Sequence, residues 1–518
     1  MSTQTHQVRD TIKPTAVEEN IFKRLLATLS HFQLQTQIRV AGGWVRDKLL
    51  GKVSHDIDIA LDNMMGTQFV DKFKEYLLSI GEDVQGFCVV KSKPEHSKHL
   101  ETAKISLFGM SIDFVNLRKE EYPENKPKNS CIPKQTFGTA EGDAYVRDLT
   151  INSLFYNIVT GAVEDWTKRG ISDLKFGKLV TPVPPKVTFL ADPLRVLRAI
   201  RFGARFDFTL DDDLKVAAAS DDVKKALAKK FKRERIGTEI DLIISGNQPV
   251  KAMTYICELT LFWTVFTLPP KHESVIFDGC ERLCISYLYN ASNLIHLLGE
   301  STFTAEQRRL ALYAALFLPL RNTTYSEEKA KKIPVVSHII RESLKQNPRT
   351  QKRSVLDLHR WSYKFLPLIP YLASGEVIQA SDLDWMGDLI DVPDSSRARV
   401  ITGFLLRELR DFWRVALLIS ILLHPIDSCD SEDEHSHFGK RKDLFNAVEN
   451  SITKLGLEDV KPLINGKDVM NVLQLKGGPL VKEWVDKTMA WQLANPSRTA
   501  KECINWLRDA NSKRVKLE

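Results

Sequence analysis

Hydrophobic and polar positions divide the chain into two parts with different periods. Through about residue 160, runs that alternate every second residue are mixed with runs that repeat every three to four residues, which predicts strands and helices in turn. The predicted strands cover residues 36–41, 54–61, 86–92 and 104–118, and the predicted helices cover 17–32, 44–50 and 69–80. The last strand is interrupted at Phe108-Gly109-Met110. Residues 119–138, rich in Pro, Lys and Asn, are predicted to form a loop.

After residue 185 the helical period dominates. Helices are predicted over residues 191–205, 211–231 and 235–244, and most of the sequence that follows also favours helix. The pattern therefore predicts an α+β protein, in which a mixed α/β head precedes an all-helical remainder. An acidic stretch at residues 427–437 has the composition of a linker. We divide the chain into a head, a helical neck, a helical body and a helical tail, over residues 1–180, 181–250, 251–426 and 427–518.

Composition adds few constraints to this picture. The 518 residues are 43% hydrophobic and 27% charged, which is ordinary for a soluble globular protein. No apolar run approaches the ~18 residues of a membrane span, so we expect no membrane partner. The net charge of +7 allows a polyanionic partner without requiring one. The seven cysteines form neither a C-x-x-C pair nor a zinc-binding pattern, which fits a reducing compartment.

The stretch SHDIDIAL, residues 54–61, carries the first candidate chemistry. On a strand, Asp56 and Asp58 share one face, because side chains alternate between the two faces. Their mutual repulsion disappears if a divalent cation binds, and Mg²⁺ prefers one or two carboxylates together with substrate phosphates. The stretch therefore indicates either a metal site or a surface strand with one polar face.

A diglycine precedes the short helix that leads to this strand. Gly42 and Gly43 allow close approach of a phosphate to the backbone, the start of the helix offers N–H groups, and Arg46 adds a guanidinium fork. A simple turn would explain the two glycines equally well. The order of strand, diglycine, helix and D-x-D within about fifteen residues nevertheless predicts a triphosphate site beside a metal site.

The same residues carry a resemblance to a known family. The stretch AGGWVRDKLLGKVSHDIDIA (residues 41–60) resembles the first signature of the nucleotidyltransferase superfamily, in the branch that contains tRNA CCA-adding enzymes and bacterial-type poly(A) polymerases. SKHLETAKISLFGMSIDFVNLRKE (97–120) is similar to eukaryotic CCA-adding enzymes in particular. Later family motifs are matched in order by VRDLTINSLFYN, VEDWTKRGISDLKFG, DPLRVLRAIRFGARFDF and KRERIGTEI. The resemblance is specific over residues 36–245, recurs weakly at 462–466 and 491–496, and implies a polymerase-β-like palm in the head.

The resemblance implies roles for particular residues. Asp56 and Asp58 would hold two Mg²⁺ ions, and Asp113, on a predicted strand, is a third candidate carboxylate. The remaining residues would bind the nucleotide, and these are Gly42, Gly43, Arg46, Arg118, Arg147, Asp148, Asp192, Arg195 and Arg198. Arg118 precedes the predicted loop, which in the family helps to position nucleotide and primer.

Two of these motifs also have simpler interpretations. Arg147 and Asp148 are predicted to open a helix, where Asp148 either accepts a hydrogen bond from the ribose or acts as an N-cap. Asp192-Pro193 is typical of a helix start, and Arg195, Arg198, Arg201 and Arg205 form a basic stripe on the helix that follows.

The resemblance implies that Asp192 and Arg195 read the incoming base. Cytosine and adenine both present an exocyclic amine beside an unprotonated ring nitrogen, which suit a carboxylate and a guanidinium. Two positions depart from the family pattern, because Val146 replaces an arginine and Ala191 replaces an acidic residue.

We therefore predict template-independent addition and repair of the 3′-terminal CCA of tRNA, using CTP and ATP. The helical part would contact the acceptor arm and elbow of the tRNA, and no obligate protein partner is predicted. A poly(A) polymerase on the same fold and a catalytically inactive RNA-binding relative are the alternatives. The family serves the nucleus, cytoplasm and mitochondrion, and the basic residues 513–516 are either a nuclear address or a basic tail.

Overall fold

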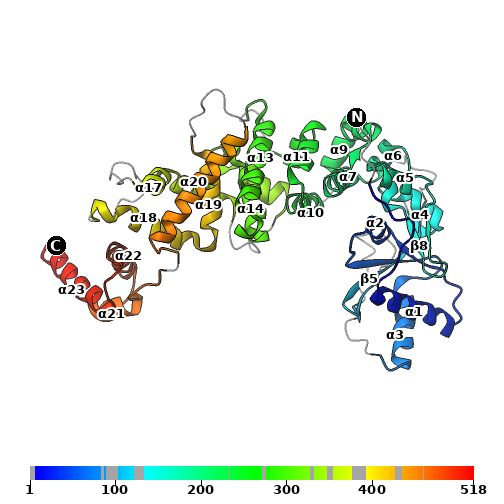
Figure 1. The fold of residues 1–518 in the computed structure, drawn as a ribbon, viewed down its shortest axis with the longest axis horizontal. Coiled ribbons are helices and arrows are strands. Elements are labelled where there is room, and N and C mark those ends of the chain that lie inside the picture. The colour runs from blue at the N-terminus through cyan, green and yellow to red at the C-terminus, as the bar shows by residue number, and fades with distance from the viewer. Residues whose placement is uncertain are drawn as a thin grey trace. The chain divides into compact units, whose positions relative to one another are not determined.

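The computed structural model describes most of the chain. The described residues are 6–82, 87–88, 103–121, 134–230, 233–270, 276–326, 332–346, 354–375, 392–425, 434–458 and 460–517. They form two compact units, Met1–Phe266 and Thr267–Glu518 (Figure 1). The predicted four-part division of the chain remains a prediction. Within the described part, no helix is both long enough and apolar enough to cross a membrane.

The first unit is built on a mixed seven-stranded sheet with the order β3-β4-β5-β2-β1-β8-β9. The strands are β1 (Ile38–Ala41), β2 (Asp56–Leu61), β3 (Phe87–Cys88), β4 (Ala103–Leu107), β5 (Met110–Asn116), β8 (Phe155–Asn157) and β9 (Ala162–Glu164). All neighbouring strands are antiparallel except β2 and β5, which run parallel. In that pair Asp58 lies directly opposite Asp113, so the topology places two of the predicted site carboxylates side by side.

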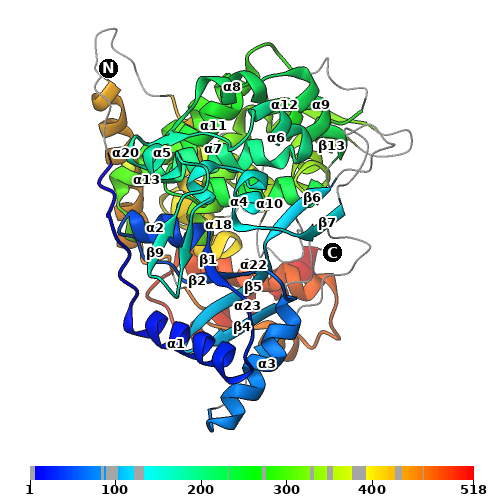
Figure 2. The same cartoon turned by 90° about the vertical axis from the view of Figure 1, so that its right-hand side faces the viewer.

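The helices of the head cover this sheet. They are α1 (Ala16–His31), α2 (Gly43–Leu49), α3 (Gly66–Ser79), α4 (Ala140–Val146) and α5 (Gly170–Lys175). Helix α3 packs on β4 and β5, and α1 packs on α3 (Figure 2). The rings of Phe69, Phe73 and Phe114 meet in this layer with centroids 5.4–6.4 Å apart, and all three are fully buried. The apolar side chains are buried on this side of the sheet. The polar start of β2 is not part of this core.

Helices continue to the end of the first unit. They are α6 (Pro185–Ala191), α7 (Leu194–Phe206), α8 (Asp212–Ala218), α9 (Asp221–Lys230), α10 (Arg233–Ile244), α11 (Pro249–Glu258) and α12 (Phe262–Val265). A short parallel pair, β10 (Lys178–Leu179) and β11 (Thr209–Leu210), joins the head to this region. Helix α7 packs on α10 and α11 through its apolar face, where Val196, Leu197 and Ile200 are fully buried. Its arginines are therefore left on the other face, as predicted.

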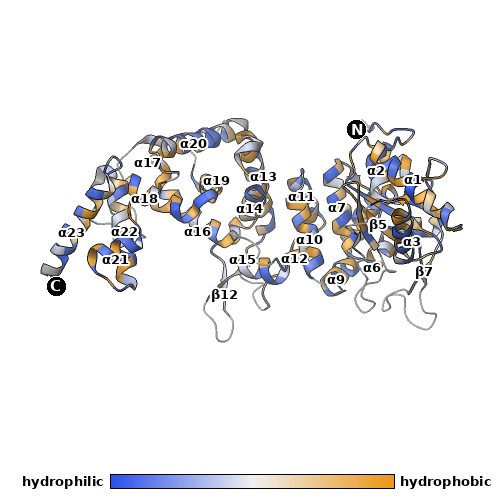
Figure 3. Cartoon of the chain, turned by 90° about the horizontal axis from the view of Figure 1, so that it is seen from below, coloured by the Kyte–Doolittle hydropathy of each residue, from blue (hydrophilic) through white to orange (hydrophobic). Residues whose placement is uncertain are grey.

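Among its described residues, the second unit is helical apart from the short antiparallel pair β12 (Thr324–Tyr325) and β13 (Ile333–Pro334). Its α-helices are α13 (Cys280–Leu298), α14 (Ala305–Leu316), α15 (Val335–His338), α16 (Val355–Phe365), α17 (Ile369–Ser374), α18 (Asp394–Leu409), α19 (Trp413–Leu423), α20 (Glu434–Lys454), α21 (Gly466–Leu473), α22 (Pro479–Ala494) and α23 (Ala500–Leu517). Most show both hydrophobic and hydrophilic stretches along the ribbon (Figure 3). Helix α19 is apolar almost all round and is buried among α13, α14, α16, α18 and α20, which makes it the centre of this core.

The α+β class is confirmed, and two local predictions are wrong. Residues 119–138 are not simply a loop, because β6 (Arg118–Glu121) and β7 (Lys134–Phe137) pair antiparallel at its two ends. Residues 147–154 do not open an α-helix. Arg147 is extended, and only a short 3-10 turn follows at Thr150–Asn152. Long-range bonds explain the second difference, since Thr150 donates its N–H to Val180 and its hydroxyl to Asp173.

Candidate active site

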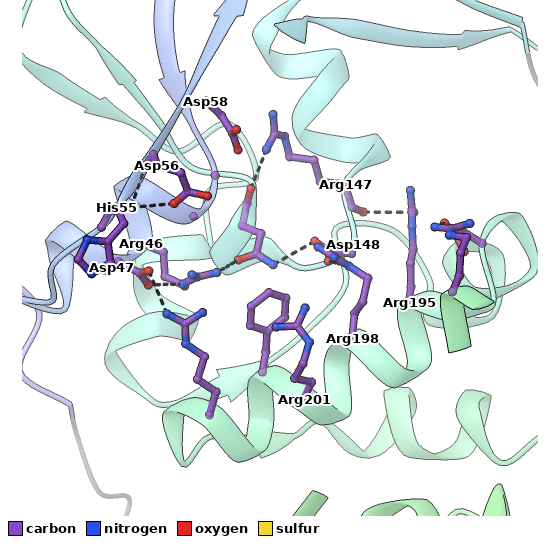
Figure 4. Close-up of a pocket in the computed structure, with 18 of the residues that line it drawn as sticks. Arg46, Asp47, His55, Asp56, Asp58, Arg147, Asp148, Arg195, Arg198 and Arg201 are labelled. Atoms are coloured by element: carbon purple, nitrogen blue, oxygen red, sulfur yellow. Dashed lines mark hydrogen bonds and ion pairs between the residues drawn. The ribbon is translucent and has the colours of Figure 1, made fainter. Parts of the chain in front are cut away.

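A pocket of about 530 Å³ lies between the sheet and helix α7. Eleven of the twelve predicted site residues line it, and these are Gly42, Gly43, Arg46, Asp56, Asp58, Arg118, Arg147, Asp148, Asp192, Arg195 and Arg198. Figure 4 shows Asp56 and Asp58 on the strand side, while Arg198 and Arg201 rise from the helix on the opposite side. The pocket therefore has one acidic wall and one basic wall.

The acidic wall is the N-terminal end of β2. Ile57 and Ile59 point into the core and are fully buried, so Asp56 and Asp58 share the pocket face as the alternation predicted. Burial raises the pKa of Asp58 to about 6; the charge of Arg147 opposes this rise, and the carboxylates of Asp113 and Asp56 add to it. Within the described part of the chain, the negative charge of these aspartates is therefore only partly balanced by positive charge. A bound cation would stabilise their ionised forms.

Asp113 is beside the pocket without lining it. It lies opposite Asp58 in the strand register, and its carboxylate accepts from Lys104 Nζ at 3.1 Å. Among the described residues, no group of three or more His, Cys, Asp or Glu side chains is arranged to hold a metal ion. The residues present fit a site in which two aspartates share the cation with substrate phosphates.

The diglycine bend places Arg46 at the base of the pocket. Gly42 has φ 70° and ψ −117°, a conformation that favours glycine, and its own N–H donates to the Leu154 carbonyl. An added Cβ at Gly42 would lie 2.8 Å from Arg147 Nη1, so the Arg147 guanidinium would have to move. Gly42 therefore allows the backbone to bend at this point, and its N–H is already bonded to the Leu154 carbonyl.

Arg46 is buried in a polar and aromatic frame. Its Nε donates to Asp47 at 2.8 Å, its Nη1 donates to Asn152, and its guanidinium lies over the rings of Phe202 and Phe206. Burial lowers the pKa of Arg46, although the charge of Asp47 opposes this. The side chain is held in place before any ligand binds.

Arg147 and Asp148 lie in the extended segment between α4 and the 3-10 turn. Arg198 donates to Asp148 at 2.8 Å, and Asn152 donates to the other carboxylate oxygen at 3.1 Å. Burial by itself would raise the pKa of Asp148, but the charges of Arg198 and Arg195 and these hydrogen bonds outweigh it, so the pKa is lowered. Asp148 is therefore ionised in the folded protein.

Asp192 and Arg195 stand at the start of α7. Asp192 accepts from the Leu194 N–H, two residues further along the chain, at 3.1 Å, and from Arg235 at 3.5 Å. Arg195 donates to the backbone carbonyls of Val146 and Arg147, at 2.7 and 3.4 Å. Val146, which departs from the family pattern, thus still contributes its carbonyl to the site. Ala191, the other departure, ends helix α6.

Two residues that hold this arrangement together were not among those predicted from the sequence. Asp143, in α4, is 1% exposed and accepts from Arg118 Nε at 2.7 Å and from Arg147 Nε and Nη2 at 2.8 and 2.6 Å. Asn152 contacts Arg46, Asp148 and, through its carbonyl, Arg147 Nη1 at 3.2 Å. The signal that was available is their spacing, since Asp143 precedes Arg147 by four residues and Asn152 follows Asp148 by four.

The basic stripe of α7 is mostly engaged by the protein. Arg201 pairs with Glu239 at 2.7 Å and lies 4.5 Å from the centre of the Phe202 ring, and Arg205 approaches Asp47 at 3.4 Å. Both arginines line the pocket. The stripe is therefore part of the site and not simply a solvated face.

Fold and pocket together define a nucleotidyltransferase. Residues 38–180 match the Poly A polymerase head domain family. The structure of a CCA-adding enzyme with CTP has the same fold, with a TM-score of 0.60 and 19% identity over 95% of this chain and 94% of that chain. The Thermotoga maritima CCA-adding enzyme complexed with tRNA is also similar in fold, with a TM-score of 0.57 and 19% identity over 95% of both chains.

Sequence relatives specify the family. The mitochondrial CCA tRNA nucleotidyltransferase of Saccharomyces cerevisiae is 33% identical over 499 residues, covering 91% of this chain and 87% of that protein. The tRNA nucleotidyltransferase cca2 of Schizosaccharomyces pombe is 33% identical over 483 residues, covering 91% of this chain and 92% of that protein. The chain belongs to the CCA tRNA nucleotidyltransferase family.

Proposed function

We propose that this protein adds and repairs the 3′-terminal CCA of tRNA, taking CTP and ATP as substrates and releasing pyrophosphate. The observation that carries the proposal is the single pocket that brings together the D-x-D aspartates, the diglycine bend and the base of α7. Relatives named for CCA addition and similar folds solved with CTP, ATP and tRNA support it. The names of two relatives also support a mitochondrial location, while the nucleus and cytoplasm remain predictions.

Asp56 and Asp58 are the residues that would hold two Mg²⁺ ions. The raised pKa of Asp58 fits this role, because a buried carboxylate beside two others is stabilised by a cation. When bound, the ions would lower the pKa of the terminal 3′-hydroxyl of the tRNA and neutralise charge on the triphosphate and the leaving pyrophosphate. Asp113 would act on the site through its position opposite Asp58.

The basic residues would position the nucleotide. Arg46 and Arg147 are pre-oriented by Asp47 and Asp143, so their free N–H groups can meet phosphate oxygens without loss of side-chain freedom. Asp148, kept ionised by Arg198, would accept a hydrogen bond from the ribose. Arg118 would contribute from the start of β6.

Asp192 and Arg195 would select the base. The Asp192 carboxylate has acceptor capacity beyond its bonds to Leu194 and Arg235, and the Arg195 guanidinium has donors beyond the two used on carbonyls. An exocyclic amine and an unprotonated ring nitrogen satisfy both, as in C and A. A carbonyl and a ring N–H, as in U and G, would each cost about 1–3 kcal/mol.

The test is incubation of the protein with tRNA that ends at the discriminator base, followed by sequencing of the product. CTP plus ATP should yield C, C and A, and neither nucleotide alone should complete the end. Asp58→Ala should extend nothing, whereas Asp62→Ala, just beyond β2 and outside the pocket, should extend normally. Long tails made from ATP alone would identify a poly(A) polymerase. Retained RNA affinity without any incorporation would identify an inactive relative.

A further inference from the structure

Three polar residues form a row across the sheet at the edge of the active site. The strand register places Asp58 of β2 opposite Asp113 of β5, and it places Asp113 opposite Lys104 of β4. Residues that lie directly opposite each other on neighbouring strands share one face of a sheet. This polar row therefore continues the acidic wall of the pocket across two further strands and ends at a positive charge.

The adjoining row of residues shows which face of the sheet carries the polar row. Ile57, Ile112 and Ile105 lie opposite one another in the same register, and all three are buried. Because side chains alternate between the two faces along each strand, the polar row points away from this core. Its first member, Asp58, lines the pocket.

Lys104 forms an ion pair with the middle member of the row. Its Nζ donates to Asp113 Oδ2 at 3.1 Å, and the side chains are 53% and 28% exposed. An ion pair this exposed contributes little to stability. Lys104 also acts on the next carboxylate along the row: burial raises the pKa of Asp58, and the charges of Arg147 and Lys104 oppose that rise.

An ammonium group at this position has two effects on a cation at Asp56 and Asp58. It occupies one carboxylate oxygen of Asp113, and it repels a second positive charge nearby. In the nucleotide-free protein, a cation would therefore have two carboxylates as ligands and would bind against this repulsion. A nucleoside triphosphate supplies both negative charge and the phosphate oxygens that Mg²⁺ prefers as further ligands.

We infer that Lys104 is an internal counter-ion, which keeps Asp113 out of the metal site until a nucleotide supplies phosphate ligands. Divalent cations then bind weakly to the protein alone and more tightly when CTP or ATP is present. Lys104 is in this sense a positioning residue, because it acts through Asp113. The inference rests on the proposed function, since it takes Asp56 and Asp58 as the cation ligands.

The experiment titrates Mn²⁺, which takes the same kinds of oxygen ligand as Mg²⁺, into the nucleotide-free full-length protein and follows free Mn²⁺ by electron paramagnetic resonance. K104M removes the charge and keeps an unbranched side chain. It should bind Mn²⁺ about 10-fold more tightly than the wild type, because a unit charge about 6 Å from a divalent cation in water-like surroundings changes the affinity by about that factor. K104R keeps the charge and should bind as the wild type does. D58N should lose the binding, which shows that the titration reports on this site.

Three comparisons separate the proposed role from a general effect of charge. K186M is the matched control, because Lys186 is 54% exposed and pairs with Asp222 at 2.7 Å outside the pocket; it should bind Mn²⁺ as the wild type does. K104M/D113N should return to within about threefold of the wild type, since the released carboxylate is then absent. With a non-hydrolysable CTP analogue bound, the advantage of K104M should shrink to less than about threefold, because phosphate oxygens replace Asp113 as ligands.

The inference is overturned if D58N loses Mn²⁺ binding while K104M binds no more tightly than the wild type, or if K186M tightens binding equally. It is also overturned if K104M/D113N keeps the full gain, or if the gain persists with the CTP analogue bound. An unchanged Mn²⁺ affinity with weaker tRNA binding would overturn it in favour of a contact between Lys104 and the RNA backbone. Failure of the wild type to add CCA would contradict the proposed function alone, since Mn²⁺ binding is measured without catalysis.

Discussion

Replacement of Asp143 tests whether its carboxylate positions the arginines of the active site. The residue does not line the pocket, yet its buried carboxylate fixes two arginines that do, Arg118 and Arg147. Burial by itself would raise its pKa, but the charges and hydrogen bonds of the two arginines outweigh this and lower it, so it is ionised. Asp143→Asn keeps the shape and removes the charge.

The structure sets the size of the effect. One carboxylate oxygen accepts from Arg118, and the other accepts both bonds from Arg147. An asparagine keeps one oxygen, so its amide N–H₂ must face one guanidinium. Loss of the charge and of two charge-assisted hydrogen bonds at a buried pair should lower the free energy of unfolding by about 3–5 kcal/mol. A misplaced Arg147 should raise the KM for CTP by about 10- to 100-fold, which corresponds to about 1.4–2.8 kcal/mol.

The assay is steady-state CCA addition together with urea unfolding, and Glu164→Gln is the matched control. Glu164 is also a carboxylate that pairs with a buried arginine, Arg39, at 2.7 Å, but neither residue lines the pocket. The Glu164→Gln protein should lose stability without any change in the KM for CTP. If Asp143→Asn is destabilised but its KM for CTP stays within twofold of the wild type, the positioning role is wrong.

Three further predictions follow from single positions. Gly42→Ala should raise the KM for CTP and lower the melting temperature, because its Cβ would displace the Arg147 guanidinium; an unchanged KM would contradict this. Asp58→Asn should abolish CCA addition yet melt no lower than the wild type without Mg²⁺, since burial makes the ionised carboxylate costly; addition at the wild-type rate would refute the metal site. Burial lowers the pKa of His359 from 6.5 to about 4, while its Nε2 donates to the Ala314 carbonyl at 2.7 Å. The unfolded chain is therefore protonated first, and stability should fall by up to about 3 kcal/mol as the pH drops from about 6.5 to 4. His359→Gln should lose most of this dependence in urea unfolding at pH 7 and pH 5, and an equal fall in both proteins would argue against it.

The elements with a strong local signal were predictable from sequence. The D-x-D strand is β2, the diglycine helix is α2, and the interruption at Phe108-Gly109 is a hairpin turn in which both residues have positive φ. Elements decided by distant contacts were not predictable. Residues 147–154 have helical local preferences, but the bonds of Thr150 to Val180 and Asp173 hold the segment in a short turn. Residues 119–121 form a strand because β7, more than ten residues away, supplies its partner.

Eleven of the predicted site residues line one pocket, and the roles given to them stay predictions. Asp113 was placed beside the site by the parallel register of β2 and β5, which the sequence alone does not fix. The supporting residues Asp143 and Asn152 were missed because their partners are arginines already assigned to the ligand. The partners of Arg195 could not be predicted either, because they are the backbone carbonyls of residues 146 and 147, which only the fold brings close to it.

Helix α7 is tied to the segment that carries Asp148 by the bonds of Arg195 and Arg198. Under the roles proposed above, the group that distinguishes nucleobases and the group that recognises the sugar move as one body. Retargeting this enzyme to a different nucleobase would then also disturb its preference for ribonucleotides over deoxyribonucleotides, and altered variants would need to be screened for both properties at once.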